Sequence, residues 1–162
     1  MKILVMGHAR HGKDTFCEML NDLGIPFESA TNISLEHAIW PMLNKFYDSK
    51  ESCFQDRVNH RPLWFTLISY YNTPDKSKLC KKVLENGDIY CGMRKRDEFE
   101  SCKHLFSHIV WVGAEDRLPP ESEESFELNI DDATVVVDNN GSLEDLCQQA
   151  REFVSYYKGI SC

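Results

Sequence analysis

The residues best suited to chemistry stand near the start of the chain, in the segment Gly7–Thr15 with the sequence GHARHGKDT. The segment fits the pattern G-x-x-x-x-G-K, in which backbone N–H groups of a glycine-rich loop surround a phosphate and a lysine adds positive charge. Gly7 and Gly12 suit such a loop because a Cβ at either position would obstruct the phosphate. We interpret the segment as a phosphate-binding loop in which Lys13 faces the transferred phosphoryl oxygens; the alternative is a plain glycine turn that contains a lysine.

The position after the lysine departs from the usual pattern. It normally holds a Ser or Thr that binds magnesium, whereas here it is Asp14, and the hydroxyl follows one residue later at Thr15. These two side chains are therefore the candidate ligands for Mg²⁺. The histidines of the loop, His8 and His11, are interpreted as variable side chains and not as catalysts.

The loop lies between a predicted strand and a predicted helix, which is the context that a phosphate-binding loop requires. The apolar run Lys2–Met6 is typical of a buried parallel strand and stops at Gly7. Residues 16–23 then repeat apolar side chains at helical spacing up to Gly24. Strand, glycine loop and helix form the first unit of the fold.

Further elements alternate along the rest of the chain. Short apolar runs predict strands at residues 26–30, 88–93, 108–113 and 134–138. Spacing, proline positions and capping residues predict helices at 34–47 (bent by Pro41), 53–71 (reopened by Pro62), from Thr73-Pro74-Asp75 to Asn86-Gly87, at 95–106, and from the capping box Ser142–Asp145 to about Tyr157. Alternation of strands and helices predicts one three-layer α/β domain, with a five-stranded parallel sheet and helices on both faces.

The composition is that of a soluble globular domain. The 162 residues are 42% hydrophobic and 27% charged, with no apolar run long enough to cross a membrane and no export signal at the N-terminus. The seven cysteines include no CxxC pair, so we interpret them as reduced thiols of a cytoplasmic protein. The formal net charge of -8 argues against stable binding to nucleic acid or to an anionic membrane.

The negative charge is concentrated in one segment. Residues 115–132 hold eight acids and one base, Arg117, whereas residues 76–103 hold eight bases and five acids. Because the acidic segment contains Pro119-Pro120 and lacks periodicity, we expect an exposed loop or lid over about 114–132 that is mobile without ligand. The basic stretch leaves room for a local positive site that binds a small anion.

Together these motifs resemble the P-loop nucleoside monophosphate kinases, most of all the deoxynucleoside monophosphate kinases of bacteriophages. Residues 12–15, GKDT, are similar to the end of the loop in that group. Residues 88–94, DIYCGMR, followed by Glu98, resemble a family strand that ends in Arg with a Glu four positions later. Residues 135–146, VVVDNNGSLEDL, resemble the last strand of the family and the turn on its base side.

The resemblance implies the three-layer P-loop NTPase fold and transfer of the γ-phosphoryl group of ATP to a nucleoside monophosphate. It implies ATP and Mg²⁺ as cofactors and a cytoplasmic location, in the host if the origin is a phage, with no membrane partner; a homodimer stays open. An acceptor-binding insert is expected over about 31–87 and a lid over about 114–132. Because the attacking oxygen already belongs to a phosphate, no Ser, His or Cys nucleophile is required.

The implied ATP site comprises the loop and the turn after the last strand: Gly7, Ala9, Arg10, His11, Gly12, Lys13, Asp14, Thr15, Asn139, Asn140 and Gly141. The chemistry needs cations that hold two polyanions in line, so the catalytic candidates are Lys13, Arg94 and Arg117. The acceptor-binding candidates are Arg57, Arg61, Trp64, Arg94 and Glu98. For Arg57 and Arg61 the alternative is a solvated helix face, and for Trp64 it is core packing.

Two departures from the family pattern bear on this assignment. The strand over 88–93 lacks the acid that often orients magnesium, so Asp14 or Asp88 would have to replace it. The lid offers only Arg117, so residues 94–96 (Arg-Lys-Arg) would share its work. Two alternative functions are a kinase of related build that acts on a hydroxymethylated base in DNA, which the net charge disfavours, and a nucleotide-binding regulatory module without turnover.

Overall fold

Four parallel strands form the sheet of the computed structural model, which describes residues 1–122 and 125–159. The strands are β1 (Ile3–Met6), β2 (Ile89–Cys91), β3 (His108–Gly113) and β4 (Val135–Asp138), in the order β2-β1-β3-β4. In the middle of the sheet, Ile3 of β1 pairs with Ile89 of β2 on one side and with His108 of β3 on the other. Glu123 and Glu124 of the acidic segment, and the cysteine at 162, lie outside the described residues.

The expectation of a fifth strand is wrong. In the structure the stretch 26–30 forms a single bridge, between Phe27 and Ile89, and does not continue as a strand. Pro26 has no N–H to donate to a neighbouring strand. The Phe27 N–H bonds the side-chain oxygen of Asn21 at 3.1 Å instead of a strand partner. The apolar character of this stretch is therefore used for packing and not for a sheet edge.

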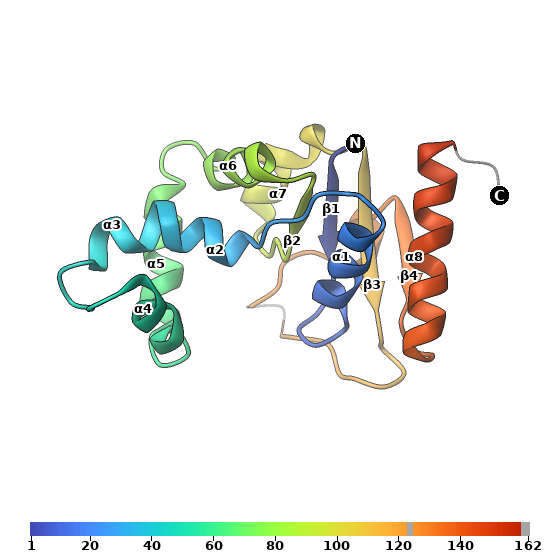
Figure 1. The fold of residues 1–162 in the computed structure, drawn as a ribbon, viewed down its shortest axis with the longest axis horizontal. Helices are drawn as coiled ribbons and strands as arrows, with labels where there is room; N and C mark the ends of the chain where they lie inside the picture. The colour runs from blue at the N-terminus through green and yellow to red at the C-terminus, as the bar shows by residue number, and fades with distance from the viewer. Residues whose placement is uncertain (123–124, 160–162) are drawn as a thin grey trace.

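Helices fill the connections between the strands, as Figure 1 shows. They are α1 (Lys13–Asp22), α2 (Ala30–Ser34), α3 (Trp40–Leu43), α4 (Lys50–Asp56), α5 (Arg61–Tyr71), α6 (Lys78–Asn86), α7 (Arg96–Cys102) and α8 (Leu143–Lys158), with a π-helical stretch at Leu35–Ile39 and 3-10 turns at Lys103–Leu105 and Ile130–Asp132. Ser142 caps α8 in a capping box with Asp145, as predicted. Among the described residues, no helix combines the length and the apolar character needed to span a membrane.

Two helix boundaries differ from their predictions. The helix predicted over 34–47 ends at Leu43, and its Pro41 directly follows the π-helical stretch Leu35–Ile39, in the first turn of α3. The predicted start at Thr73-Pro74-Asp75 is wrong, because α6 begins at Lys78 with Ser77 as the residue that precedes it. The second error arises where a proline was used to place the start of a helix.

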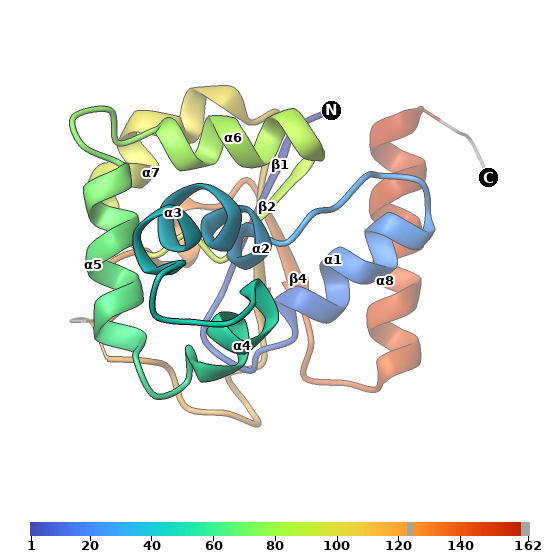
Figure 2. The same ribbon diagram turned by 60° about the vertical axis from the view of Figure 1, so that its left-hand side comes forward.

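Apolar side chains cover both faces of the sheet and give the molecule three layers. Helices α1 and α8 pack on one face around Phe16, Leu20 and Phe153, which we call the α1–α8 core. Helices α6 and α7 pack on the other around Val83 and Phe99, which we call the α6–α7 core. Figures 1 and 2 show these two helix pairs on opposite sides of the strands. The predicted three-layer arrangement is confirmed.

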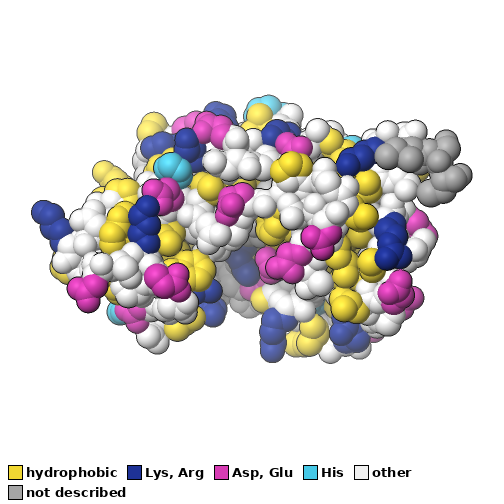
Figure 3. All heavy atoms as spheres, viewed as in Figure 1, with side chains coloured by type: hydrophobic (Ala, Val, Ile, Leu, Met, Phe, Trp, Pro, Cys, Tyr) yellow, Lys and Arg dark blue, Asp and Glu magenta, His cyan; other side chains and the backbone are white. Residues whose placement is uncertain are grey.

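Helices α2 to α5 form a lobe beside the edge strand β2, with an apolar cluster of its own. This lobe core contains Ala38, Ile39, Cys53 and Trp64. In Figure 1 the lobe lies next to β2, at the opposite side of the sheet from α8. Figure 3 shows that the surface is hollowed between the lobe and the rest of the molecule, with Lys or Arg atoms at the bottom of the hollow.

Candidate active site

All four strands end at the same edge of the sheet because they are parallel, and the predicted site residues follow those ends. The phosphate loop follows β1, and Arg94 comes three residues after β2. The acidic segment follows β3, and the turn that begins at Asn139 follows β4. The topology therefore brings together residues that are far apart in the sequence, at the lower edge of the sheet in Figure 1.

Two glycines shape the phosphate loop, for a reason that differs from the expected one. Gly7 has φ 145, and a Cβ there would lie 2.3 Å from the carbonyl oxygen of Val112 in β3. Gly12, which precedes α1, has φ 95, and its Cβ would lie 2.2 Å from the side-chain nitrogen of Asn139. Both positions need glycine because the loop packs tightly against its protein neighbours. Arg10, with φ 66, turns the loop between them and is exposed.

Lys13 lies on the inner side of the loop. It is only 8% exposed, and its Nζ lies 3.4 Å from the carbonyl oxygen of His8. Asp14 is exposed in the first turn of α1, where the Cys91 thiol donates a weak 3.5 Å hydrogen bond to its carboxylate, and Thr15 follows it. Lys13 therefore carries a positive charge at a nearly closed position beside the loop backbone.

The two loop histidines hold the acidic segment against the loop, a role that the sequence did not reveal. The His11 ring is fully buried, and its Nδ1 accepts a hydrogen bond from the Ala114 N–H at 3.0 Å. The His8 ring contacts the rings of Trp111 and Phe126, at centroid distances of 5.3 and 5.1 Å. Burial and the neighbouring His11 lower the pKa of His8, which keeps its imidazole neutral near pH 7.

A carboxylate bridges the phosphate loop and Arg94. One oxygen of Glu121 accepts a hydrogen bond from the Ala9 N–H at 2.6 Å, and the other accepts one from the Arg94 guanidinium, also at 2.6 Å. In the sequence Glu121 is one of eight acids of the segment 115–132, and no local signal separates it from the others. The structure thus places the loop and Arg94 close enough to share one anionic group.

The turn after β4 packs against the phosphate loop and the start of the acidic segment. The side-chain nitrogen of Asn139 donates to the His11 carbonyl oxygen at 2.9 Å. Arg117 donates from Nε to the Asn139 carbonyl oxygen at 3.1 Å, and the Asp116 N–H donates to the side-chain oxygen of Asn140 at 3.0 Å. Of the predicted ATP-site residues after β4, Asn139 therefore adjoins the loop, while Asn140 and Arg117 connect this turn to the acidic segment.

A pocket of about 410 Å³ lies between α5 and α7, next to the basic residues that follow β2. Its lining includes Phe65, Lys95 and the predicted acceptor residue Glu98. Burial raises the pKa of Glu98 to about 7, against the opposing effect of the hydrogen bond that the Tyr90 hydroxyl donates at 2.9 Å. Trp64 is 7% exposed in the lobe core and presents no open ring face, whereas the adjacent Phe65 does.

The other two predicted acceptor residues lie on the lobe. The Arg57 guanidinium sits 3.8 Å from the centre of the Phe54 ring and donates to the Phe54 carbonyl oxygen at 2.8 Å. Arg61 is exposed at the first residue of α5, and this helix begins at its lower end in Figure 1. The Arg57 guanidinium bonds within the lobe, whereas Arg94 bonds to Glu121, so the described structure does not bring these two arginines onto one partner.

Of the two acids named as substitutes for a magnesium-orienting residue, only Asp14 lies at this edge. Asp88 precedes β2, at the opposite edge of the sheet, and pairs with Lys2 at 2.8 Å. Within residues 1–122 and 125–159 there is no group of three or more His, Cys, Asp or Glu side chains arranged to hold a metal ion. Any divalent cation here would have to share ligands with a bound phosphate.

The acidic segment is held against the rest of the protein by residues before and after positions 123–124, so it is not simply an exposed loop. Phe126 and Leu128 are 4% and 3% exposed and belong to the α6–α7 core. These two apolar residues alternate within a polar stretch, which is the short sequence signal for their burial. The expectation of a fully exposed segment is therefore wrong at these two residues, whereas Ser125, Glu127 and Asn129 beside them are exposed.

Comparison with known proteins bears on the fold. No protein-family model and no curated protein matches the sequence. Among solved structures, TT1252 from Thermus thermophilus matches with a TM-score of 0.54 and 14% identity, covering 100% of this chain and 98% of that one. Dephospho-CoA kinase from Campylobacter jejuni matches with a TM-score of 0.52 and 19% identity, covering 99% of this chain and 100% of that one. At these identities the likeness shows a shared α/β fold with a parallel sheet.

Proposed function

We propose that this protein is a P-loop kinase that transfers the γ-phosphoryl group of ATP to a nucleoside monophosphate, with deoxynucleotides among its acceptors. The observation that carries the proposal is the bridge between the phosphate loop and Arg94 through one carboxylate. Because the phosphate loop and Arg94 can hold one anion between them, they are also placed to hold the donor and the acceptor phosphate of a phosphoryl transfer. The fold shared with a dephospho-CoA kinase supports a kinase of this build.

On the donor side, the loop backbone and Lys13 would hold the phosphates of ATP. The Ala9 N–H already binds a carboxylate oxygen, so the loop accepts an anion in its present conformation. Lys13, nearly closed off from water, would stabilise charge that develops on the transferred group more strongly than an exposed lysine would. Asn139 and Arg117, at the turn after β4, would border the nucleotide.

On the acceptor side, Arg94 would hold the phosphate of the monophosphate and the pocket beside it would hold the base. A ring such as Phe65, 53% exposed at the pocket, offers a face on which a base can stack, worth about 1–3 kcal/mol per base. Glu98 supplies a carboxyl group that can bond to a base edge. Transfer between two phosphates needs no protein nucleophile, because the attacking oxygen belongs to the acceptor phosphate.

Asp14 and Thr15 are the residues that would hold Mg²⁺ together with the ATP phosphates. Their oxygen ligands suit a hard cation that keeps several waters, and the exposed Asp14 carboxylate leaves room for them. When bound, the cation neutralises charge on the phosphates. The protein's own contribution is to fix the loop, Lys13 and Arg94 around the reacting groups.

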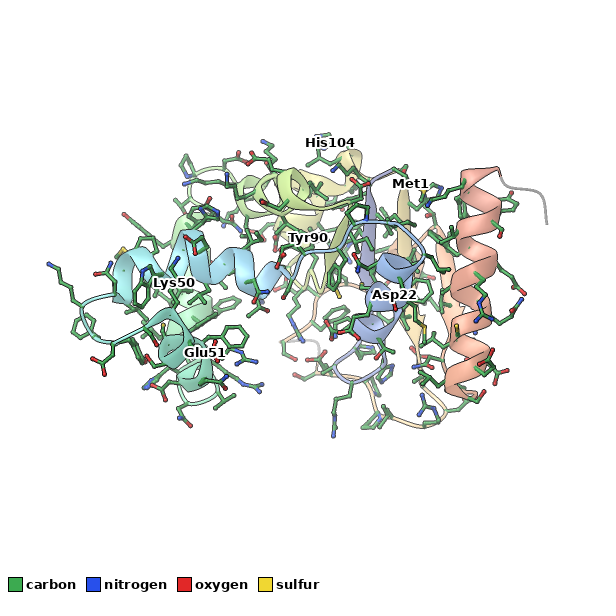
Figure 4. The ribbon with its side chains drawn as sticks, viewed as in Figure 1. Met1, Asp22, Lys50, Glu51, Tyr90 and His104 are labelled. Carbon is green, nitrogen blue, oxygen red and sulfur yellow. The ribbon has the colours of Figure 1, made fainter. Side chains whose placement is uncertain are left out.

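The test is a coupled assay of ADP release against the eight common ribo- and deoxyribonucleoside monophosphates. We expect turnover with a subset of them and a loss of at least about a thousandfold in Lys13→Ala, since a cation at the transition state is removed. Lys50→Ala is the matched control, because Lys50 is an exposed lysine in α4, in the lobe, where Figure 4 labels it. Circular dichroism checks that both variants fold.

Three results would contradict the proposal. The first is a folded Lys13→Ala protein that keeps more than about a tenth of the rate. The second is turnover only with a modified base in DNA. The third is ATP binding without product from any monophosphate, which would instead indicate a regulatory module.

A further inference from the structure

The Glu121 carboxylate occupies a position that touches both anion-binding groups of the site. Its two oxygens accept from the Ala9 N–H and from Arg94, each at 2.6 Å. The side chain is 20% exposed, so water reaches it little. Burial opposes ionisation, yet the hydrogen bonds from Arg94 and Ala9 outweigh it and lower the pKa of Glu121. At neutral pH the group between loop and Arg94 is therefore an anion.

The backbone around Glu121 is positioned as well as its side chain. The Glu121 N–H donates to Nδ1 of His8 at 3.2 Å, and the His8 ring packs on Phe126. The segment thus binds the loop through a backbone contact, a side-chain contact and an aromatic contact. Together these contacts fix the position of the carboxylate relative to the phosphate loop.

The same segment also neutralises the rest of the basic run that follows β2. Lys95 pairs with Glu127 at 2.7 Å, and Arg96 pairs with Asp132 at 2.5 Å through two parallel hydrogen bonds. Each base of the run therefore has an acidic partner from the segment. The positive site that the sequence suggested for a small anion is filled from within the chain.

We propose that Glu121 is an internal competitor of the nucleotide phosphates: its carboxylate fills the phosphoryl position between the phosphate loop and Arg94, and ligands must displace it to bind. This inference rests on the proposed function, since it takes that position as the phosphoryl site. Carboxylates and phosphates bind guanidinium groups and N–H groups in the same geometry, so one can replace the other. A phosphate carries more charge and more acceptor oxygens than a carboxylate, so at sufficient concentration it displaces the Glu121 side chain.

Removal of the carboxylate charge should therefore tighten nucleotide binding, although it breaks contacts in the free protein. Glu121→Gln keeps the side-chain size and leaves an amide oxygen for one partner, but it ends the competition of one anion with another. We expect the dissociation constants of ATP and of inorganic phosphate to fall by at least about tenfold. Hydrolysis of ATP without an acceptor should rise in parallel, because the transferred group then meets water at a site that the carboxylate no longer fills.

Asp132→Asn is the matched control. It removes an acid of the same segment from an ion pair with the same basic run, but Asp132 contacts Arg96 and not the phosphate loop. We expect its ATP and phosphate affinities to stay within about twofold of the wild type. Glu121→Ala is a second variant, which should also tighten binding if the side chain is a competitor and not a ligand-holding group.

The experiment is isothermal titration of the full chain with ATP and with inorganic phosphate, for wild type, Glu121→Gln, Glu121→Ala, Asp132→Asn and Lys13→Ala. Folded Glu121 variants whose affinity is unchanged or weaker would overturn the inference and leave the proposed function standing, provided that the wild type binds ATP in a Lys13-dependent way. If neither the wild type nor the Glu121 variants bind ATP, both the inference and the proposed function fail. An equal gain in Asp132→Asn would show that relief of general negative charge, and not the Glu121 position, is responsible.

Discussion

The side-chain nitrogen of Asn139 donates a hydrogen bond to the main-chain oxygen of His11 at 2.9 Å, which ties the turn after β4 to the phosphate loop. A Cβ on Gly12 would lie only 2.2 Å from the same nitrogen and would clash with it. The end of the last strand therefore fixes the loop residue that precedes α1. The loop shape depends on a contact between residues 128 positions apart.

Substitution of Asn139 should loosen the loop and weaken ATP binding. We expect Asn139→Ala to lose about tenfold in affinity, the equivalent of one hydrogen bond, and Asn139→Asp to lose more because its carboxylate would face the His11 oxygen. Titration with a fluorescent ATP analogue measures both. Asn86→Ala, an exposed asparagine at the end of α6, is the control. Equal affinities in the wild type and Asn139→Asp would contradict the role.

Gly7 should tolerate alanine far less well than another glycine of positive φ. Gly159, after α8, has φ 66 and nothing within 4 Å of its Cβ position, so Gly159→Ala should cost only about 1 kcal/mol of left-handed backbone strain. Gly7→Ala adds a clash with the Val112 carbonyl oxygen, and we expect a loss of about 3 kcal/mol or more. Urea unfolding of both variants gives the two values. Similar losses would mean that the loop moves away from β3 at little cost.

Arg94→Ala should damage use of the acceptor and spare ATP. We expect kcat/KM for the monophosphate to fall by at least about a hundredfold, because the guanidinium that holds the acceptor phosphate is gone. ATP affinity should not weaken, since Arg94 also holds Glu121 in the free protein. Arg94→Lys should recover only part of the loss because it lacks the planar fork. Arg151→Ala on the exposed side of α8 controls for charge, and unchanged kinetics in Arg94→Ala would remove Arg94 from the site.

The stability of the fold should depend on pH through Glu98. Its pKa is about 7 in the folded protein against an ordinary value of 4.5, because burial disfavours the charged form. The raised value favours the folded state fully below pH 4.5, and this contribution is lost as the pH rises through 7. Glu98→Gln should therefore be more stable than the wild type at pH 8, by up to about 3 kcal/mol, and equal to it near pH 4.5.

Thermal unfolding from pH 4.5 to 8 tests this, with Glu100→Gln as the control. Glu100 is an exposed carboxylate on the same helix, α7. A difference between Glu98→Gln and the wild type that does not change with pH would show that Glu98 is not the titrating group.

The parts of the site that sequence reasoning located are those encoded locally. The loop Gly7–Thr15 and the capped start of α8 depend on neighbouring residues, and their patterns are visible in a short window. The stretch 26–30 has strand-like composition, but whether it pairs depends on Pro26 and on distant partners. Glu121 meets Ala9 across 112 positions, and no spacing rule distinguishes it from the other acids of its segment.

Helix α5 belongs to two apolar clusters at once. Ile68 and Tyr71, in its last turns, pack against both the α6–α7 core and the lobe core. Its first residue, Arg61, is exposed. The helix is also held nearer its start, because Trp64 and Leu67 pack in the lobe core. The lobe therefore cannot shift relative to the sheet without either carrying α5 along or separating Ile68 and Tyr71 from one of the two clusters.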